Sequence, residues 1–259
     1  MGLVRERFRV MRILISNDDG IYSPGVVALA EVARQFGEVR IVAPDVEQSS
    51  MGHAITANRP LEYRRTPLGE FEAFRVNGTP ADCVALGVDQ WGGVDVVLSG
   101  INLGTNLGTA IWHSGTVAAA KQATIFGLQG IAFSTAVDAE VPEFGRLRPH
   151  IEKILQLLIQ RASPRLVNVN LPVSPRGIQW TRQSVRRYDA EIVGTKDPMG
   201  RDRYWFTVTP VGEAEPETDR WAFEHDWVSI TPLSLDLTDY SALQEAAESS
   251  KARSGRNSP

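Results

Sequence analysis

Two adjacent carboxylates follow a short apolar strand near the start of the chain. The stretch Arg12–Ser16 is rich in aliphatic residues, as a buried strand is, and Asn17-Asp18-Asp19-Gly20 comes directly after it. In an open α/β sheet, ligands bind beyond the carboxyl ends of the strands. Two like charges there repel each other unless a cation neutralises them, and carboxylate oxygens suit Mg²⁺, Mn²⁺ or Ca²⁺. The motif therefore predicts a site for a hard cation, with an ordinary solvated Asp-Asp-Gly turn as the alternative.

The composition of the 259-residue chain predicts an ordinary soluble globular protein. Hydrophobic residues make up 42% and charged residues 22%, and the net charge of −4 gives no reason to expect binding to nucleic acid or acidic lipid. No apolar run approaches the roughly 20 residues that span a bilayer, and residues 1–10 lack the uninterrupted apolar region of a signal peptide. We therefore expect a cytoplasmic protein. Its single cysteine, Cys83, lies in the apolar helical pattern of residues 80–86 and is expected in the core.

The first half of the chain alternates between strand-like and helix-like patterns. Such alternation predicts an α/β fold: a mostly parallel sheet with right-handed crossovers, covered by helices on both faces. The expected strands are residues 12–16, 39–44, 94–100 and 131–134, and the expected helices are residues 24–36 and 116–126.

The second half is expected to add more elements and then an extended arm. An amphipathic helix is predicted at residues 147–161, and strands at residues 166–171 and 227–237. Two further β segments, residues 179–185 and 203–209, are predicted to pair as a two-stranded ribbon, which is marginal alone.

This ribbon arm, at about residues 179–209, carries more apolar surface than a free hairpin should expose. We expect it to be exchanged between subunits of a homodimer, with a homotetramer as a larger possibility. The chain is thus expected to comprise an N-terminal extension at residues 1–10, one domain at residues 11–240 and a frayed tail at residues 241–259. The aromatic residues of the arm are Trp180, Tyr188, Tyr204, Trp205 and Phe206.

Three more loops at predicted strand or helix ends consist largely of small polar residues and glycine. They are residues 45–53, residues 99–108 and residues 112–116, the last of which runs into a predicted helix. A helix N-terminus with free N–H groups and cap hydroxyls binds phosphate well. Plain N-capping and ordinary turn chemistry are the alternatives for each loop alone. Taken together, the four loops would place a divalent cation opposite a phosphate-binding site. Such an arrangement can hydrolyse a phosphate ester.

The same segments resemble the survival protein E (SurE) family. The resemblance runs from about residue 11 to about residue 237. It implies a Rossmann-like core with C-terminal elements exchanged between subunits. It also implies a divalent-metal-dependent nucleotidase that removes phosphate from nucleoside 5′- and 3′-monophosphates. The segments that carry it are Ser16-Asn17-Asp18-Asp19-Gly20, Val42-Ala43-Pro44-Asp45, the Ser49 loop, Gly78-Thr79-Pro80-Ala81-Asp82-Cys83, Ser99-Gly100-Ile101-Asn102-Leu103-Gly104 and Ser114-Gly115-Thr116-Val117-Ala118-Ala119-Ala120.

Carried over position by position, the resemblance implies one divalent cation per subunit, Mg²⁺, Mn²⁺ or a similar ion. Asp18 and Asp19 would also be the catalytic pair. The implied metal ligands are Asp18, Asp19, Ser49 and Asn102, and the implied phosphate-binding residues are Asn106, Ser114, Gly115 and Thr116.

Other functions stay open at this point. The glycine-rich loops could belong to a nucleotide-binding module without catalysis, but no G-x-G-x-x-G follows the first strand. A phosphatase that forms an aspartyl-phosphate, and a broad phosphatase or exopolyphosphatase, are the other enzyme alternatives. A Walker-type NTPase is disfavoured because its phosphate-binding motif is missing from the sequence. His113 and His53 are weaker candidates for acid–base or modulating roles.

Overall fold

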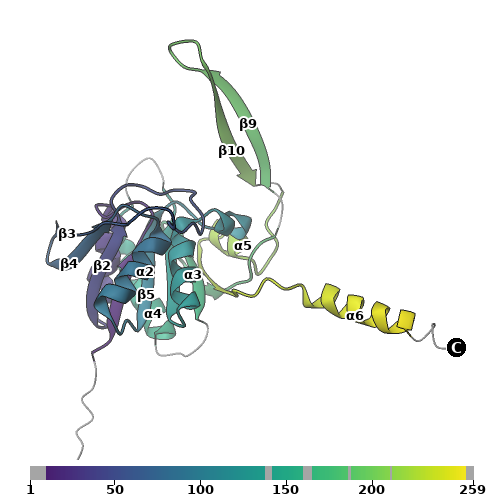
Figure 1. Cartoon of the computed structure of the whole chain (residues 1–259), viewed down its shortest axis with the longest axis horizontal. Helices are drawn as coiled ribbons and strands as arrows, with labels where there is room; N and C mark the ends of the chain where they lie inside the picture. The colour runs from purple at the N-terminus through teal and green to yellow at the C-terminus, as the bar shows by residue number, and fades with distance from the viewer. Residues whose placement is uncertain (1–9, 138–141, 160–164, 186–187, 211, 255–259) are drawn as a thin grey trace, which may run out of the picture.

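A nine-stranded mixed sheet forms the centre of the molecule (Figure 1). The computed structural model describes residues 10–137, 142–159, 165–185, 188–210 and 212–254. The strand order is β3-β4-β2-β1-β5-β6-β7-β11-β8, in which β4, β2, β1, β5, β6 and β7 run parallel. The strands are β1 (Arg12–Ser16), β2 (Glu38–Pro44), β3 (Tyr63–Leu68), β4 (Phe71–Val76), β5 (Val96–Leu103), β6 (Gln129–Thr135), β7 (Leu166–Leu171), β8 (Gly177–Trp180) and β11 (Trp227–Leu233).

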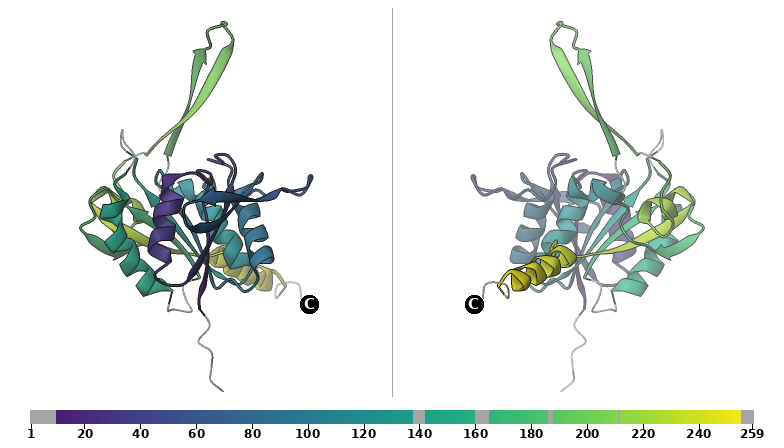
Figure 2. Two further views of the ribbon diagram at one scale, coloured as in Figure 1. Left: turned by 90° about the vertical axis from the view of Figure 1, so that its left-hand side faces the viewer. Right: turned by 90° about the vertical axis from the view of Figure 1, so that its right-hand side faces the viewer.

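Helices cover both faces of this sheet, so the predicted α/β fold class is confirmed (Figure 2). α1 (Pro24–Ala33) and α4 (Phe144–Leu158) pack on one face, and α2 (Pro80–Trp91) and α3 (Gly115–Ile125) pack on the other. The short helices η1 (Gly108–Trp112) and α5 (Asp219–Glu224) lie in loops, and α6 (Tyr240–Ser254) follows the last strand.

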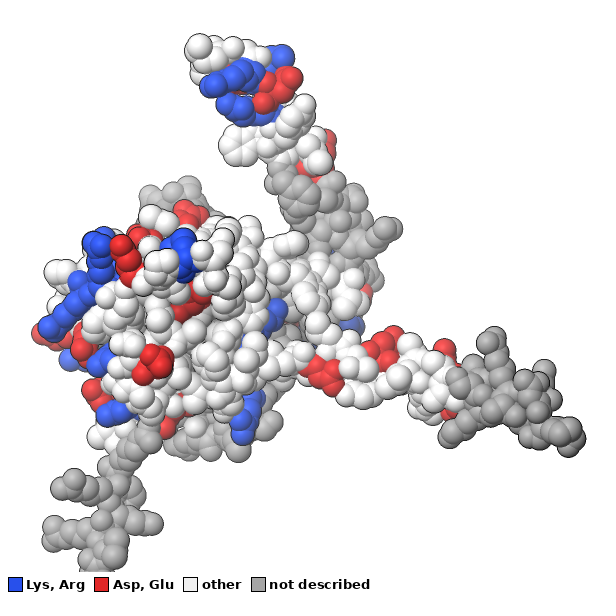
Figure 3. Space-filling view, in the orientation of Figure 1, with Lys and Arg blue, Asp and Glu red and all other residues white. Residues whose placement is uncertain are grey.

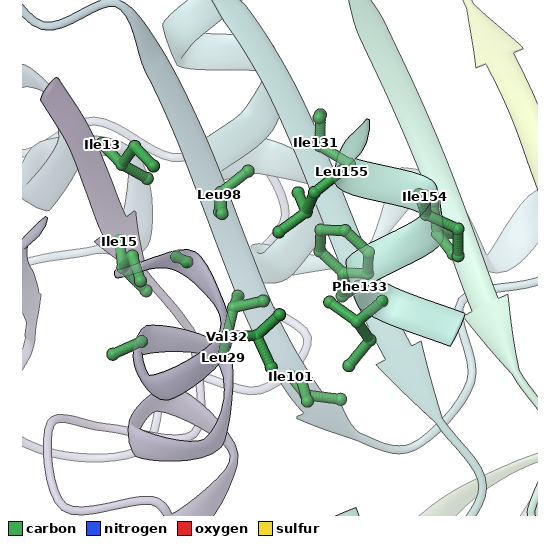
Figure 4. Close-up of a cluster of buried hydrophobic side chains, with 14 of the residues drawn as sticks. Ile13, Ile15, Leu29, Val32, Leu98, Ile101, Ile131, Phe133, Ile154 and Leu155 are labelled. Atoms are coloured by element: carbon green, nitrogen blue, oxygen red, sulfur yellow. The ribbon is translucent and has the colours of Figure 1, made fainter. Parts of the chain in front are cut away.

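The larger core lies between the sheet and the α1–α4 layer (Figure 4). Aliphatic side chains from β1, β5 and β6 meet side chains from α1 and α4, and Phe133 is the largest fully buried one. A second cluster under α2 and α3 includes Cys83, which is fully buried as expected. Burial of this apolar surface on both faces holds the parallel strands in one plane, with their carboxyl ends at a common edge.

Helix starts agree with their capping signals. Ser23 caps α1 with Pro24 in its first turn, and Thr79 and Asp82 form a capping box at α2. The Ser114 hydroxyl accepts a hydrogen bond from the Val117 N–H at α3. These caps fix where each helix begins relative to the strand before it.

The structure adds one hairpin to the predicted sheet and corrects one boundary. The β3–β4 hairpin was not predicted, because its strands carry charged residues at many positions and β3 contains Pro67. The expected loop at residues 99–108 begins later, since β5 continues to Leu103 with a register shift between Ser99 and Asn102. The backbone there is still hydrogen-bonded to β6, which is why it counts as strand.

The ribbon arm exists, but its first strand is not the predicted one. β9 (Tyr188–Lys196) pairs with β10 (Asp202–Pro210), whereas β8, with Trp180, joins the main sheet beside β11. Both segments alternate polar and apolar residues, so periodicity does not distinguish an edge strand from a ribbon strand. The arm projects away from the sheet, and its tip carries Lys and Arg close to Asp (Figures 1 and 3).

The expectation for the C-terminal segment is also corrected. Most of the stretch expected to be a frayed tail is the helix α6, which extends away from the sheet (Figure 1). Its Ala, Glu, Gln and Leu residues have high helix propensities, which explains a helix with a weak apolar pattern. Residues 1–9 of the expected extension and residues 255–259 lie outside the described residues. Across the described part of the chain, no helix is long and apolar enough to cross a membrane.

Candidate active site

Asp18 and Asp19 follow β1, at the point in the sheet where the chain connections leave in opposite directions. β1 is central, with β2 on one side and β5 on the other, so its carboxyl end opens into the crevice where ligands of such sheets bind. The chain turns there because the Asn17 amide donates to the Gly20 carbonyl at 2.8 Å and Gly20 has a φ of 96°. The turn places Asp18 in a buried position and leaves Asp19 partly exposed.

The Asp18 carboxylate is held by the start of α3. Thr116 Oγ1 donates to Asp18 Oδ1 at 2.5 Å. Burial raises the pKa of Asp18, and hydrogen bonds from the Thr116 hydroxyl and from the N–H groups of Thr116 and Gly115 oppose that rise. The N-terminus of α3 is predicted to bind phosphate, but in the structure its donors at Gly115 and Thr116 bind the Asp18 carboxylate. Close approach depends on Gly115, since a Cβ there would lie 2.8 Å from Asp18 Cβ.

The Asp19 carboxylate faces the end of β5. The Leu103 N–H donates to Asp19 Oδ2 at 3.1 Å. Burial and then the negative charge of Asp18 raise the pKa of Asp19 to about 7, although the Leu103 hydrogen bond works in the opposite direction. Two carboxylates that disfavour each other's charge in a buried crevice are the setting in which a bound cation is stabilising.

Ser49 and Asn102 come from the two strands that flank β1. Ser49 follows β2, is exposed, and donates its hydroxyl to Glu47 Oε1 at 2.6 Å. Asn102 lies in β5, and its Nδ2 donates to the Gly104 carbonyl at 2.6 Å, so that Oδ1 is the atom oriented to act as a ligand. The Gln48 N–H donates to the Asp18 carbonyl at 2.7 Å, which ties the Ser49 loop to the carboxylates.

A cavity of about 890 Å³ brings most of the predicted residues together. Gly115 and Thr116 are not on its wall but contact Asp18, and Asp19 contacts Leu103. The residues that line the cavity are Asp18, Ser49, Ser50, Asn102, Leu103, Gly104, Thr105, Asn106, Thr109, Ala110, Trp112, His113 and Ser114.

The donors of this cavity fit a hard divalent cation. Asp18, Asp19, Ser49 and Asn102 offer only carboxylate, hydroxyl and amide oxygens, as Mg²⁺ and Mn²⁺ prefer. In the described part of the chain no three His, Cys, Asp or Glu side chains cluster as a metal site, so a cation here would need the neutral ligands as well. None of the residues named as lining the cavity is Lys or Arg, so a divalent cation there would supply positive charge opposite a bound phosphate.

Asn106 is buried and is fixed by three residues that the sequence did not single out. Its Nδ2 donates to Ser134 Oγ at 2.8 Å, and its N–H donates to Asn170 Oδ1 at 2.8 Å. The Asn106 carbonyl accepts from Asn168 Nδ2 at 2.7 Å and from Asn170 Nδ2 at 3.0 Å. The polar alternation within β7 was the available signal, because asparagines in an otherwise apolar buried strand need partners.

The two histidines occupy different places. His113 is exposed on the cavity wall, beside Ser114. His53 Nε2 lies 2.9 Å from Gln122 Oε1 of α3 and is engaged away from the carboxylates. Trp112, which the sequence analysis did not select, also lines the cavity and is 51% exposed.

Fold and site together define a class: a Rossmann-like α/β protein with an oxygen-rich crevice at the switch point of its sheet. The sequence model of the family described as Survival protein SurE matches residues 13–190. The chain belongs to the SurE family, and the resemblance found from its motifs is confirmed.

Known relatives cover nearly the whole chain. The 5′-nucleotidase SurE 1 of Thermus thermophilus is 49% identical over 240 residues, which are 90% of this chain and 96% of the relative. The 5′-nucleotidase SurE of Deinococcus radiodurans is 42% identical over 248 residues, 92% of each chain. The crystal structure of the SurE protein from Aquifex aeolicus aligns with a TM-score of 0.78 at 38% identity, over 90% of this chain and 97% of that chain.

Proposed function

We propose that this chain is a metal-dependent phosphomonoesterase that hydrolyses nucleoside 5′- and 3′-monophosphates to nucleoside and phosphate. The observation that carries the proposal is the adjacent pair Asp18 and Asp19, held at the start of α3 and the end of β5, with Asp18 on the cavity wall. The names of the relatives from Thermus and Deinococcus, both 5′-nucleotidases, support activity on the 5′-monophosphates.

In this proposal Asp18, Asp19, Ser49 and Asn102 hold one divalent cation per subunit. A bound cation would polarise the phosphate and lower the pKa of a water molecule. A carboxylate of the Asp pair accepts the proton of the attacking water. The chain's own part is to bring both carboxylates to one point, with Thr116 orienting Asp18 and the Leu103 N–H orienting Asp19.

Phosphate binding is assigned to Ser114 and Asn106, which also line the cavity. The Ser114 hydroxyl oxygen accepts from Val117 N–H, so its own proton is available to a substrate oxygen. Asn106 is fixed through its main chain and through the hydrogen bond from its Nδ2 to Ser134. Gly115 and Thr116 act through Asp18 in this arrangement. Donors fixed beforehand stabilise charge that shifts onto the phosphate oxygens in the transition state.

The nucleoside is assigned to the apolar part of the cavity around Trp112. This ring is two residues before Ser114 and half-exposed, and Lys121 Nζ lies 5.2 Å from its centroid. An exposed indole can stack on any nucleobase, so Trp112 can contribute to binding whichever base the nucleotide carries. The size of the cavity also leaves room for the alternative substrate, inorganic polyphosphate.

Two further parts of the proposal concern the whole protein. We assign it to the cytoplasm, where nucleoside monophosphates occur, and to a homodimer that exchanges the β9–β10 arm. Exposed apolar side chains on the arm support the second assignment: Ile192 is 68%, Tyr204 71% and Trp205 64% exposed.

The test is phosphate release from nucleoside 5′- and 3′-monophosphates, β-glycerophosphate and polyphosphate, before and after chelation and with Mg²⁺ or Mn²⁺ restored. We expect metal-dependent release from the nucleotides. Trp112→Ala should raise KM for nucleotides more than for β-glycerophosphate, whereas Trp180→Ala, on the edge strand β8, should change neither. The proposal is contradicted if activity survives complete chelation. It is also contradicted if none of the nucleotides releases phosphate.

A further inference from the structure

Gly108 is held at both its main-chain polar groups by side chains from the C-terminal part of the chain. Its N–H donates to Asp219 Oδ2 at 2.8 Å, and its carbonyl accepts from Gln183 Nε2 at 2.9 Å. Gly108 is buried, has a φ of 54° and is the first residue of η1. These side chains supply the pairing that a neighbouring strand would otherwise give to the main chain.

Asp219 is a buried carboxylate that accepts hydrogen bonds from main-chain N–H groups. It has no exposed surface, and its Oδ1 accepts from Ser184 N–H and from Arg220 N–H, each at 2.8 Å. Burial raises its pKa, and hydrogen bonds from main-chain N–H groups, led by that of Gly108, oppose the rise. A charge buried in this way is costly without such partners, and the hydrogen bonds join Asp219 and these segments into one unit.

The wall of the cavity depends on where Gly108 lies. Thr109, Ala110 and Trp112 belong to η1 and line the cavity, and Ser114 follows immediately. On the other side of Gly108, Asn106 is fixed by Ser134, Asn168 and Asn170. The segment from residue 106 to residue 108 is thus held at both ends by buried side chains.

We infer that Asp219 and Gln183 are positioning residues, which fix Gly108 and thereby hold η1 and Ser114 in place to bind the substrate phosphate and nucleoside. Neither side chain is among the residues named as lining the cavity, so they act through the main chain of Gly108. The inference rests on the proposed function of that cavity.

The same unit lies at the foot of the arm. Ser184 precedes β9, and Asp219 follows β10 along the chain. Asp219 therefore joins the base of the arm to the cavity wall through its two carboxylate oxygens.

Asp219→Asn tests the inference because an amide has only one acceptor oxygen. Two N–H groups share Oδ1 and one uses Oδ2, so the oxygen should stay at Oδ1 and the new NH₂ should face Gly108 N–H. We expect kcat/KM for AMP to fall by about 10- to 100-fold, as for a displaced binding wall. Inhibition by inorganic phosphate should weaken in parallel, while Mn²⁺ affinity and oligomeric state stay as in the wild type.

Gln183→Leu is the second variant, and it decides the question if Asp219→Asn does not fold. It removes only the donor to the Gly108 carbonyl and should change the same quantities in the same direction. The matched control is Glu224→Gln in the same helix α5, which alters an ion pair with Arg220 and no contact to Gly108.

Wild-type-like kcat/KM and phosphate inhibition in both variants overturn the inference, as does an equal loss in Glu224→Gln or a parallel loss of Mn²⁺ affinity. Failure of the proposed function looks different: the wild type itself would not release phosphate from AMP. Phosphate and Mn²⁺ binding, measured by calorimetry, would then still report whether Asp219 and Gln183 position the wall.

Discussion

The Thr116 hydroxyl donates a 2.5 Å hydrogen bond to the Asp18 carboxylate, joining positions 98 residues apart in the sequence. This contact fixes one carboxylate of the pair against the first turn of α3. It leaves Asp19, held by the Leu103 N–H, as the more exposed member.

Replacing Thr116 with Val should weaken metal binding. The change keeps the shape of the side chain and removes the donor to Asp18, and loss of such an outer contact typically lowers metal affinity or activity by about 10- to 100-fold. Calorimetric Mn²⁺ affinity and kcat measure the effect. Thr116→Ser retains the hydroxyl and should stay close to the wild type. If Val and Ser behave alike, the hydroxyl does not orient Asp18.

Gly115→Ala should disturb the same carboxylate by steric contact. The added Cβ would lie 2.8 Å from Asp18 Cβ and 2.9 Å from Asp18 Oδ2, so the carboxylate or the helix must shift. We expect a fall in kcat of about 10²-fold, as for an approximately 1 Å misplacement. Gly145→Ala is the control, since a Cβ at that position in α4 meets nothing within 4 Å. A fully active Gly115→Ala enzyme contradicts the arrangement.

Removing the metal should make stability depend on pH. The folded-state pKa of Asp19, at about 7, lies above its ordinary value of 3.8, and that of Asp18 is also raised. Folding therefore favours the protonated carboxyls, and this contribution is lost as the pH rises through about 7. In chelator, Tm should be lower at about pH 8 than at about pH 5.5. Added Mg²⁺ or Mn²⁺ should raise Tm more at the higher pH, because protons no longer compete for the carboxylates. A larger rise in Tm on adding metal at the lower pH would contradict this prediction.

The exposed aromatic residues of the arm lead us to expect that the protein is an oligomer. Sedimentation at micromolar concentration should show a dimer or a larger assembly, because a free ribbon would leave Tyr204 and Trp205 in water. Replacing residues 188–210 with a short glycine linker should give a smaller species, and Met199→Ala, at the exposed turn of the arm, should not. A wild-type monomer, or an armless variant of unchanged size, excludes exchange of the arm.

Much of the fold follows from local patterns in the sequence. The strand at Arg12–Ser16 and the helix start at Ser114 carry strong signals, namely an apolar run and a cap residue, and both lie where predicted. The carboxylate pair could be placed at the edge of the sheet for the same reason: it directly follows a buried strand.

The rest depends on contacts between distant segments. A Ser-Gly-Thr cap looks the same whether its donors face a ligand or Asp18, and only the packing of α3 beside β1 decides between them. The Gly108–Asp219 contact joins residues 111 positions apart, and Asp219 read alone is an ordinary first-turn helix residue. Ribbon strands and edge strands share one periodicity, so the pairing of β8 with β11 could not be separated from that of β9 with β10.

The most direct test of the account is phosphate release from AMP by Asp18→Asn and Asp19→Asn at saturating Mn²⁺, with circular dichroism to confirm that both variants fold. Each change removes one negative charge from the proposed metal site with little change in shape. We predict that turnover falls by several orders of magnitude in both variants and that Mn²⁺ binding weakens. Near-normal turnover by either folded variant under these conditions would contradict the assignment of this pair as the catalytic metal site.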